Sequence, residues 1–230
     1  MSKKEVGIII PMFNEELVII EVLKKLKQVR PNDTIIIVDD GSSDNSYDVV
    51  KKQTSDVYLL KHNVNLGQGA ALQTGIDFAK KLNIDYLITF DSDGQHSPMD
   101  IQPFVDKAKE GDFGIILGSR FLGEAVNMSK FKHYFLKVST YFTWLTSGIR
   151  LTDSHNGFRL INLKKHSNFE MTHNGMSHAS EIIDLIHSNK MTYIEMPCTI
   201  IYSDYSKVKG QSMFNSINIV LDVLFGKVSK

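Results

Sequence analysis

The sequence predicts an α/β domain with a mostly parallel central sheet that is flanked by helices. Short apolar runs alternate with amphipathic helical patterns, and this alternation favours parallel strands joined by crossover helices. A chain of 230 residues fits one large domain better than two independent ones. Polar clusters directly follow several predicted strands, and in sheets of this class ligands bind beyond the carboxyl ends of the strands.

Apolar and β-branched runs place the elements of the first half. The first helix begins at Glu15, and its candidate core positions include Leu17. Another helix begins at Ser97-Pro98, where Ser caps the helix and Pro occupies its first turn. Strands are predicted at 6–10, 34–38, 57–60, 86–90 and 113–117, and helices at 15–29, through about 53, through about 82 and after 97.

The second half of the chain is less regular in its pattern. Helices are expected at 127–147 and 179–188, and a strand at 191–197. A polar loop at 203–212 precedes a final helix near 213–225. A soft boundary near residue 120 separates this half from the strand-rich first half.

Composition restricts the function classes. The formal net charge is zero, which gives no whole-molecule attraction to nucleic acid. Cys198 is the single cysteine, so we expect no internal disulfide and a reducing cytoplasm. No stretch approaches the ~20 apolar residues that span a bilayer. The N-terminal apolar run ends at Pro11 without a small-residue cleavage site, so a secretion signal is not expected.

The segment Asp91-Ser92-Asp93 carries the main chemical signal. Two carboxylates one residue apart at the end of a strand can converge on one hard cation through oxygen ligands. A bound Mg²⁺ or Mn²⁺ bridges a diphosphate and neutralises the charge that grows as it leaves. Gln95 and His96 can complete or support this shell, and the alternative is a solvated acidic turn.

Other polar segments follow the remaining strands. Asp39 and Asp40 can accept hydrogen bonds from a base or a ribose, although a helix cap with a turn also explains this segment. The glycines of residues 65–69 let backbone approach a ligand closely. Arg120 can grip phosphate with its planar fork, or form a surface salt bridge.

Six ordered segments together resemble the family-2 glycosyltransferases of the GT-A fold, and most of all the dolichol- and polyprenol-phosphate sugar transferases. The resemblance spans roughly residues 6 to 212, and the full chain is then one GT-A catalytic domain. It implies a nucleotide-sugar-binding half at about 1–120 and an acceptor-binding half at about 121–230. The segments are 10–15 (IPMFNE), 38–42 (VDDGS), 65–69 (NLGQG), 91–96 (DSDGQH), 118–121 (GSRF) and 152–159 (TDSHNGFR).

The resemblance also implies roles for individual residues. The resemblance implies that Asp91, Asp93 and Gln95 bind the metal, Mg²⁺ or Mn²⁺. It also implies that Arg120 faces the donor or acceptor phosphate. The donor, a UDP- or GDP-sugar, is bound by a larger set of residues. Its members are Pro11, Phe13, Asn14, Glu15, Asp39, Asp40, Gly67, Gly69, Asp91 and Arg120, with Lys207, Lys209 and Ser212 in a loop that closes over the diphosphate.

The acceptor is predicted to be a polyprenyl- or dolichyl-phosphate lipid in cell-surface polysaccharide or glycolipid synthesis. Relatives that act on sugar hydroxyls often carry an adjacent Glu-Asp pair as the base, and residues 179–184 have no such pair. Glu181 is the only plausible base there, and a charge on the helix surface is its alternative role. The phosphate-acceptor relatives often read Pro-Thr-Ser where this chain has Ser154-His155-Asn156. A transferase acting on a sugar hydroxyl of a growing glycan therefore stays as an alternative.

Residues 127–147 raise the question of a membrane contact. Two adjoining stripes run along this predicted helix, one with Phe131, Phe135, Val138, Phe142 and Leu145, the other with Lys130, Tyr134, Lys137, Tyr141 and Trp144. Aromatic side chains beside lysines suit a helix in a membrane interface, and a Phe stripe packed on the core is the alternative. We expect peripheral contact with the inner face of the cell membrane, or a homo-oligomer or membrane-protein partner.

Two other classes remain as rivals. Asp91-Ser92-Asp93-Gly94 superficially matches the nucleophile motif of haloacid-dehalogenase-type phosphatases, but that motif normally follows the first strand and precedes Thr, whereas here it follows the fourth strand and precedes Gln95. A non-catalytic sugar-nucleotide-binding protein is the other rival. The intact acidic pair and Arg120 argue against it.

Overall fold

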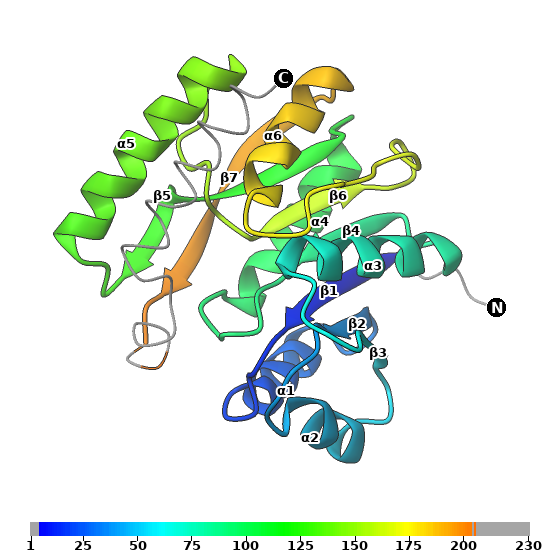
Figure 1. Cartoon of the computed structure of the whole chain (residues 1–230). Helices are drawn as coiled ribbons and strands as arrows, with labels where there is room; N and C mark the ends of the chain where they lie inside the picture. Colours follow the sequence, from blue (N-terminus) through cyan, green and yellow to red (C-terminus); the bar gives the residue numbers. More distant parts are fainter. Residues whose placement is uncertain (1–4, 204, 206–230) are drawn as a thin grey trace.

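The computed structural model describes residues 5–203 and 205, in which one sheet joins both halves of the chain (Figure 1). Its strand order is β3-β2-β1-β4-β6-β5-β7. Within the described residues four of six strand pairings are parallel, which confirms the mostly parallel sheet. The strands are β1 Val6–Met12, β2 Thr34–Asp39, β3 Tyr58–Lys61, β4 Tyr86–Thr89, β5 Ile115–Val126, β6 Arg159–Asn162 and β7 Tyr193–Ile201.

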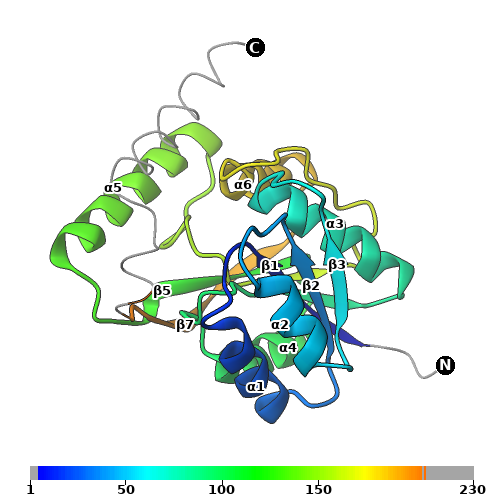
Figure 2. The ribbon, with the colours of Figure 1, turned by 60° about the horizontal axis from the view of Figure 1, so that its bottom comes forward.

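Helices cover both faces of the sheet (Figure 2). The lower layer in that view contains α1, α2 and α4, and the upper layer contains α3 and α6. α5 lies to one side, beyond β5. The helices are α1 Ile19–Val29, α2 Ser46–Gln53, α3 Gln68–Lys81, α4 Ile101–Glu110, α5 Lys130–Ser147 and α6 His178–Ser188, with a short 3-10 turn at Pro98–Asp100.

The core explains why the strands read as continuous apolar runs. All seven residues of β1 are buried. Ile8 and Ile10 pack in one cluster with Leu23 of α1, whereas Ile9 packs in the opposite cluster with Ile76 of α3. A strand with helices on both faces has no solvent side, so its sequence shows no polar alternation.

The first helix is shorter than predicted. α1 begins at Ile19, because a loop over residues 13–18 is tied to the start of α2. The backbone N–H of Glu15 donates to Ser46 Oγ at 2.6 Å, and that of Glu16 donates to Asp44 at 3.2 Å. Leu17, predicted to face the core, lies in this loop and is 77% exposed.

The second half departs most from the prediction. β5 continues to Val126 and runs across the expected boundary near residue 120. β6 was not predicted, because it is four residues long and pairs antiparallel between β4 and β5. It carries the end of the 152–159 segment into the sheet, so this segment lies beside β4 and its acidic pair.

α5 does not bury the apolar stripe that the core alternative placed against the sheet. Its buried residues are Leu136, Ser139 and Thr140. Phe131, Val138 and Leu145 of the predicted core stripe are exposed by 58, 47 and 62%. That alternative is wrong for these residues, because the inner face of α5 is polar and bonds to the 154–155 segment.

Candidate active site

A cavity of about 520 Å³ lies beyond the carboxyl ends of β1 and β4. The N-terminal ends of α3 and α6 contribute to its wall, and so do Lys132, Leu136 and Ser139 of α5. This is the position that the parallel-sheet rule predicts. Both halves of the chain therefore contribute to one cavity.

Asp91 and Asp93 both line this cavity and are held by neighbouring side chains. Asp91 Oδ2 accepts from His96 Nε2 at 2.8 Å, and its Oδ1 accepts from Gln68 at 3.1 Å. Asp93 accepts from the backbone N–H of Gln95 at 3.0 Å and also from its side-chain amide. Gln95 therefore orients Asp93, and its predicted role as a metal ligand stays a prediction.

The pKa values of the two carboxylates are shifted in opposite directions. Burial and the neighbouring charge of Asp91 raise the pKa of Asp93 to about 6. Burial alone would raise the pKa of Asp91 as well, but His96 and Arg159 lower it below its usual value. Two acidic side chains that repel each other inside one cavity fit a divalent cation, since a cation favours both ionised forms.

Residues at the ends of β1 and β2 and just after them border the same cavity, and several of them have structural partners. Pro11, Phe13 and Glu15 line it, whereas the Asn14 side chain accepts from Ser43 N–H at 2.8 Å. Both oxygens of Asp40 accept backbone N–H groups, those of residues 66 and 67. Asp40 thus holds the glycine-rich loop at the edge of the cavity.

Asp39 differs from Asp40. It is fully buried at the end of β2, outside the cavity lining. Its Oδ1 accepts from the backbone N–H of Ser42 at 3.4 Å, and within the described residues its buried Oδ2 has no hydrogen-bond partner. A buried acceptor without a donor costs free energy unless a ligand group reaches it.

The glycines of the 65–69 segment bring the backbone close to another loop of the chain, whereas the predicted approach to a ligand stays a prediction. Gly67 has a φ of +102°, and a Cβ there would lie 2.4 Å from the carbonyl oxygen of Asn174. A Cβ on Gly69 would lie 2.0 Å from the carbonyl oxygen of His173. These glycines therefore bring the start of α3 against the loop that precedes α6.

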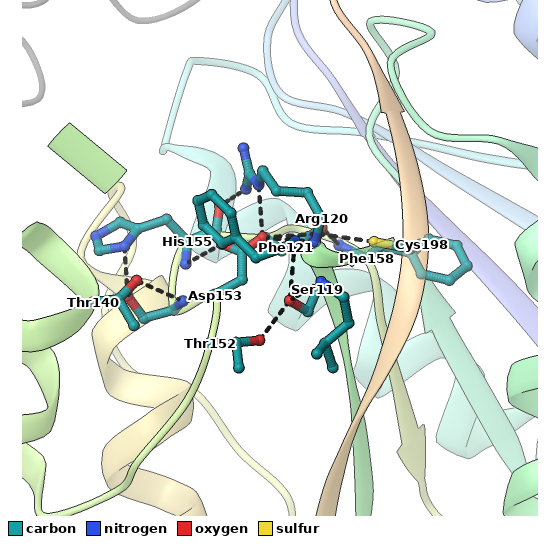
Figure 3. A network of polar contacts seen from close by, with 12 residues as sticks. Ser119, Arg120, Phe121, Thr140, Thr152, Asp153, His155, Phe158 and Cys198 are labelled. Atoms are coloured by element: carbon teal, nitrogen blue, oxygen red, sulfur yellow. Dashed lines mark hydrogen bonds and ion pairs between the residues drawn. The ribbon is translucent and has the colours of Figure 1, made fainter. Parts of the chain in front are cut away.

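Arg120 lies in a buried polar network rather than on the surface (Figure 3). Its Nε donates to Asp153 at 2.6 Å, its Nη1 to Tyr202 at 2.7 Å and its Nη2 to the carbonyl of His155 at 3.0 Å. Burial opposes its charge, but Asp153 raises the pKa of Arg120 above its usual value. Arg120 also lines the cavity, so the alternative of a surface salt bridge is wrong.

The structure places Glu181 elsewhere. Its carboxylate accepts from the backbone N–H groups of Thr172 and His173, at 2.6 and 2.9 Å. Glu181 is 8% exposed and does not line the cavity. The predicted base is therefore corrected to a buried anchor of the loop before α6. Lys207, Lys209, Ser212 and the helix at 213–225 lie outside the described residues.

Four titratable residues of the cavity lining have no predicted role: Lys132, His155, Arg159 and His178. His155 and Arg159 belong to the 152–159 segment, so the resemblance contained a signal for them. Lys132 lies on the aromatic helix, where it is one lysine among several. The sequence has no motif around His178, and only the fold brings it to the cavity.

The sequence of this chain matches one known protein family. The model of "Glycosyl transferase family 2" matches residues 7–169, more than half of the chain. The chain belongs to glycosyl transferase family 2. This membership confirms the predicted enzyme class and replaces the phosphatase and non-catalytic alternatives.

Relatives and solved structures extend this result. The UDP-N-acetylglucosamine–dolichyl-phosphate N-acetylglucosaminyltransferase of Methanococcus voltae is 33% identical over 253 residues, which cover 100% of this chain and 99% of the relative. The undecaprenyl-phosphate mannosyltransferase of Micrococcus luteus is 26% identical over 156 residues, covering 66% of this chain and 63% of the relative. These names support the predicted resemblance of this family-2 glycosyltransferase to polyprenol-phosphate sugar transferases.

The fold has a counterpart among solved structures. Glucosyl-3-phosphoglycerate synthase of Mycobacterium tuberculosis, in complex with Mn²⁺ and UDP-glucose, gives a TM-score of 0.71 at 12% identity. The match covers 98% of this chain and 78% of the other. At this identity the likeness concerns the fold alone, and it confirms the predicted GT-A type.

Proposed function

We propose that this family-2 glycosyltransferase moves a sugar from a nucleoside-diphosphate sugar to a polyprenyl- or dolichyl-phosphate lipid, with a divalent cation and inversion at the anomeric carbon. The observation that carries the proposal is the shared cavity. Asp91 and Asp93 line it together with three cationic side chains, Arg120, Lys132 and Arg159. The full-length relative named as a dolichyl-phosphate transferase supports the acceptor class.

The acidic pair supports a metal-bound donor. Asp91 and Asp93 would hold Mg²⁺ or Mn²⁺, and the bound cation would stabilise the negative charge of the leaving diphosphate. Within residues 5–203 and 205 no group of three or more His, Cys, Asp or Glu side chains is arranged to hold a metal ion. Phosphate oxygens of the donor and water would therefore supply the remaining ligands.

The cations support a phosphate acceptor. Lys132 Nζ lies 4.3 Å from the centre of the Tyr202 ring, and Arg120 donates to the hydroxyl of the same tyrosine. Burial and the charge of Arg120 lower the pKa of Lys132, so an anion between the two cations relieves their repulsion. An acceptor phosphate oxygen attacks the anomeric carbon, and the bond to the diphosphate breaks with its electron pair on the leaving group.

The position of Glu181 bears on the alternative acceptor. A sugar hydroxyl needs a base within hydrogen-bond reach, whereas a phosphate oxygen is already anionic. The carboxylate of Glu181 is occupied by backbone N–H groups outside the cavity. This arrangement favours the lipid phosphate over a sugar hydroxyl.

A peripheral membrane position follows from the same proposal. None of the helices that the structure describes is long and apolar enough to span a membrane. The outer face of α5, here called the aromatic face, is formed by Phe131, Tyr134, Val138, Tyr141, Trp144 and Leu145, each at least 40% exposed. Lys130 and Lys137 are exposed on the same helix, a combination that favours a helix lying in a membrane interface.

A release assay tests the proposal. We expect nucleoside diphosphate release from a UDP- or GDP-sugar to require both the metal and a polyprenyl phosphate, with a glycolipid product identified by mass spectrometry. Lys132→Gln should raise KM for the lipid phosphate about tenfold, the loss of one charge-assisted contact. Lys24→Gln, which removes an exposed charge from α1 outside the cavity lining, serves as the control. Transfer to a glycan hydroxyl without the lipid would contradict the proposed acceptor.

A further inference from the structure

His178 has one ring nitrogen fixed by the backbone. Nδ1 lies 2.9 Å from the carbonyl oxygen of Gly175, and a carbonyl only accepts, so Nδ1 carries the proton. Burial and the charge of Arg159 lower the pKa of His178 to about 4. The ring is therefore neutral near pH 7, and Nε2 holds a lone pair that can accept a hydrogen bond.

The backbone around His178 fixes its position. It is the first residue of α6, 4% exposed, and lines the cavity. A Cβ on Gly69 would lie 3.0 Å from His178 Cβ, and the N–H of Ala70 donates to the carbonyl of Asn174 at 3.1 Å. The start of α3 therefore holds the start of α6 in place.

Arg159 supplies a donor in the same cavity. It is the first residue of β6, pairs with Thr89 of β4, and is 3% exposed. Its buried Nη1 has no hydrogen-bond partner within the described residues, although the side chain lines the cavity. Burial lowers its pKa to about 10, so the guanidinium stays charged near pH 7, and an unused donor on it costs free energy until a ligand oxygen reaches it.

The two groups select the chemistry of their ligand. A hydroxyl both donates and accepts, so it can accept from Arg159 while it donates to His178 Nε2. A phosphate oxygen would bring only lone pairs toward Nε2 and would be repelled there. Arg159 and His178 line the same cavity as Asp91, and the charge of Arg159 lowers the pKa of Asp91. The pair therefore lies next to the position proposed for the diphosphate, where the donor sugar is attached.

We propose that Arg159 and His178 form a subsite for a hydroxyl group of the transferred sugar, and that this subsite determines which donor sugar is accepted. The inference rests on the proposed function, because the ligand is the sugar of a nucleoside-diphosphate sugar. It assigns recognition of the sugar to the wall that β6 and α6 form, and recognition of the diphosphate to the acidic pair.

Paired binding titrations test this subsite on the full chain with Mn²⁺. UDP and GDP are compared with the corresponding nucleotide sugars in the wild type, His178→Phe, His178→Gln and Arg159→Lys. We expect His178→Phe to weaken nucleotide-sugar binding about ten- to a hundredfold, since an unpaired donor and acceptor are left behind. Its affinity for the nucleoside diphosphate alone should be unchanged. Gln places an amide oxygen near Nε2, so it should restore part of the loss.

Two controls keep the outcomes distinct. His187→Phe makes the same change at an exposed position of the same helix, and it should bind both ligands like the wild type. If a cavity variant unfolds, deoxy-sugar nucleotides tested on the wild type replace it, and one of them should bind about tenfold or more weakly. Two results overturn the subsite. One is that the wild type binds every deoxy-sugar nucleotide as tightly as the parent nucleotide sugar. The other is that the ratio of nucleotide-sugar affinity to nucleoside-diphosphate affinity is the same in His178→Phe as in the wild type. Failure of the wild type to bind either nucleoside diphosphate overturns the proposed function, and the subsite with it.

Discussion

The acidic pair after β4 and the inner face of α5 border the same cavity, but the chain builds them in different ways. Ile88 of β4 and Phe90 directly after this strand lead to Asp91, and both are buried in the core. α5 instead turns Ser139 and Thr140 inward and leaves Tyr141 and Trp144 exposed. The first region is held by the core, and the second by hydrogen bonds to one loop.

This difference separates two requirements of the site. Residues that bind a cation and a diphosphate need fixed positions, which a buried sheet provides. A wall that admits a long lipid needs polar contacts at the cavity and an apolar exterior. The polar inner face of α5 and its aromatic face fit that second requirement.

The largest expected effect tests the fixed region. Asp93→Asn should lower turnover by at least about 10²–10³-fold, because a preorganised charge at the leaving group is lost. The melting temperature should not fall, since burial and Asp91 already disfavour the ionised form of Asp93. Turnover is measured by nucleoside diphosphate release with Mn²⁺, and a variant that keeps near-full metal-dependent turnover would remove Asp93 from the site.

The second prediction concerns the network that joins the two regions. Asp153→Asn should lower the free energy of unfolding by about 3–5 kcal/mol, because it leaves Arg120 as a buried charge without its partner. Urea denaturation followed by circular dichroism measures this change. Glu21→Gln breaks an exposed pair with Lys25 and should leave the transition where it is. Equal transitions for all three proteins would show that the Arg120 pair does not hold the network.

A smaller effect is expected at the aromatic face. Changing Tyr141 and Trp144 together to Ser should lower partitioning onto anionic lipid vesicles about tenfold or more, since the aromatic area is no longer buried in the interface. Co-sedimentation measures the partition coefficient. Tyr193→Ser removes a 38% exposed aromatic from β7 and is the matched control. Unchanged partitioning of the double variant would assign this face to a protein partner instead.

The last prediction concerns the pH dependence of stability. Burial lowers the pKa of His155 from 6.5 to about 4. Between these values the unfolded chain binds a proton that the folded chain excludes, so stability from this site is full above about pH 6.5 and falls toward pH 4. His155→Gln should reduce proton uptake on unfolding by up to about one proton in this window. Urea midpoints measured from pH 7 to pH 4 for both proteins test this, and parallel curves would contradict it.

The sequence alone predicted the elements whose pattern is local. β1, β2 and β4 appear as apolar runs because helices cover both faces, and the 91–96 segment follows β4 at the cavity as expected. Leu17 was placed wrongly because hydrogen bonds to the start of α2 hold residues 15 and 16 in a loop, so that α1 begins later than predicted. Their partners lie about 30 residues away in the chain.

Only the tertiary structure decided the remaining parts of the site. β6 is too short to be recognised alone, yet its position between β4 and β5 brings Arg159 beside Asp91. His178 has no motif and reaches the cavity through the contact of α6 with α3. The polar side of α5 faces inward because Ser154 and His155 offer it hydrogen bonds, and a helical wheel does not contain those partners.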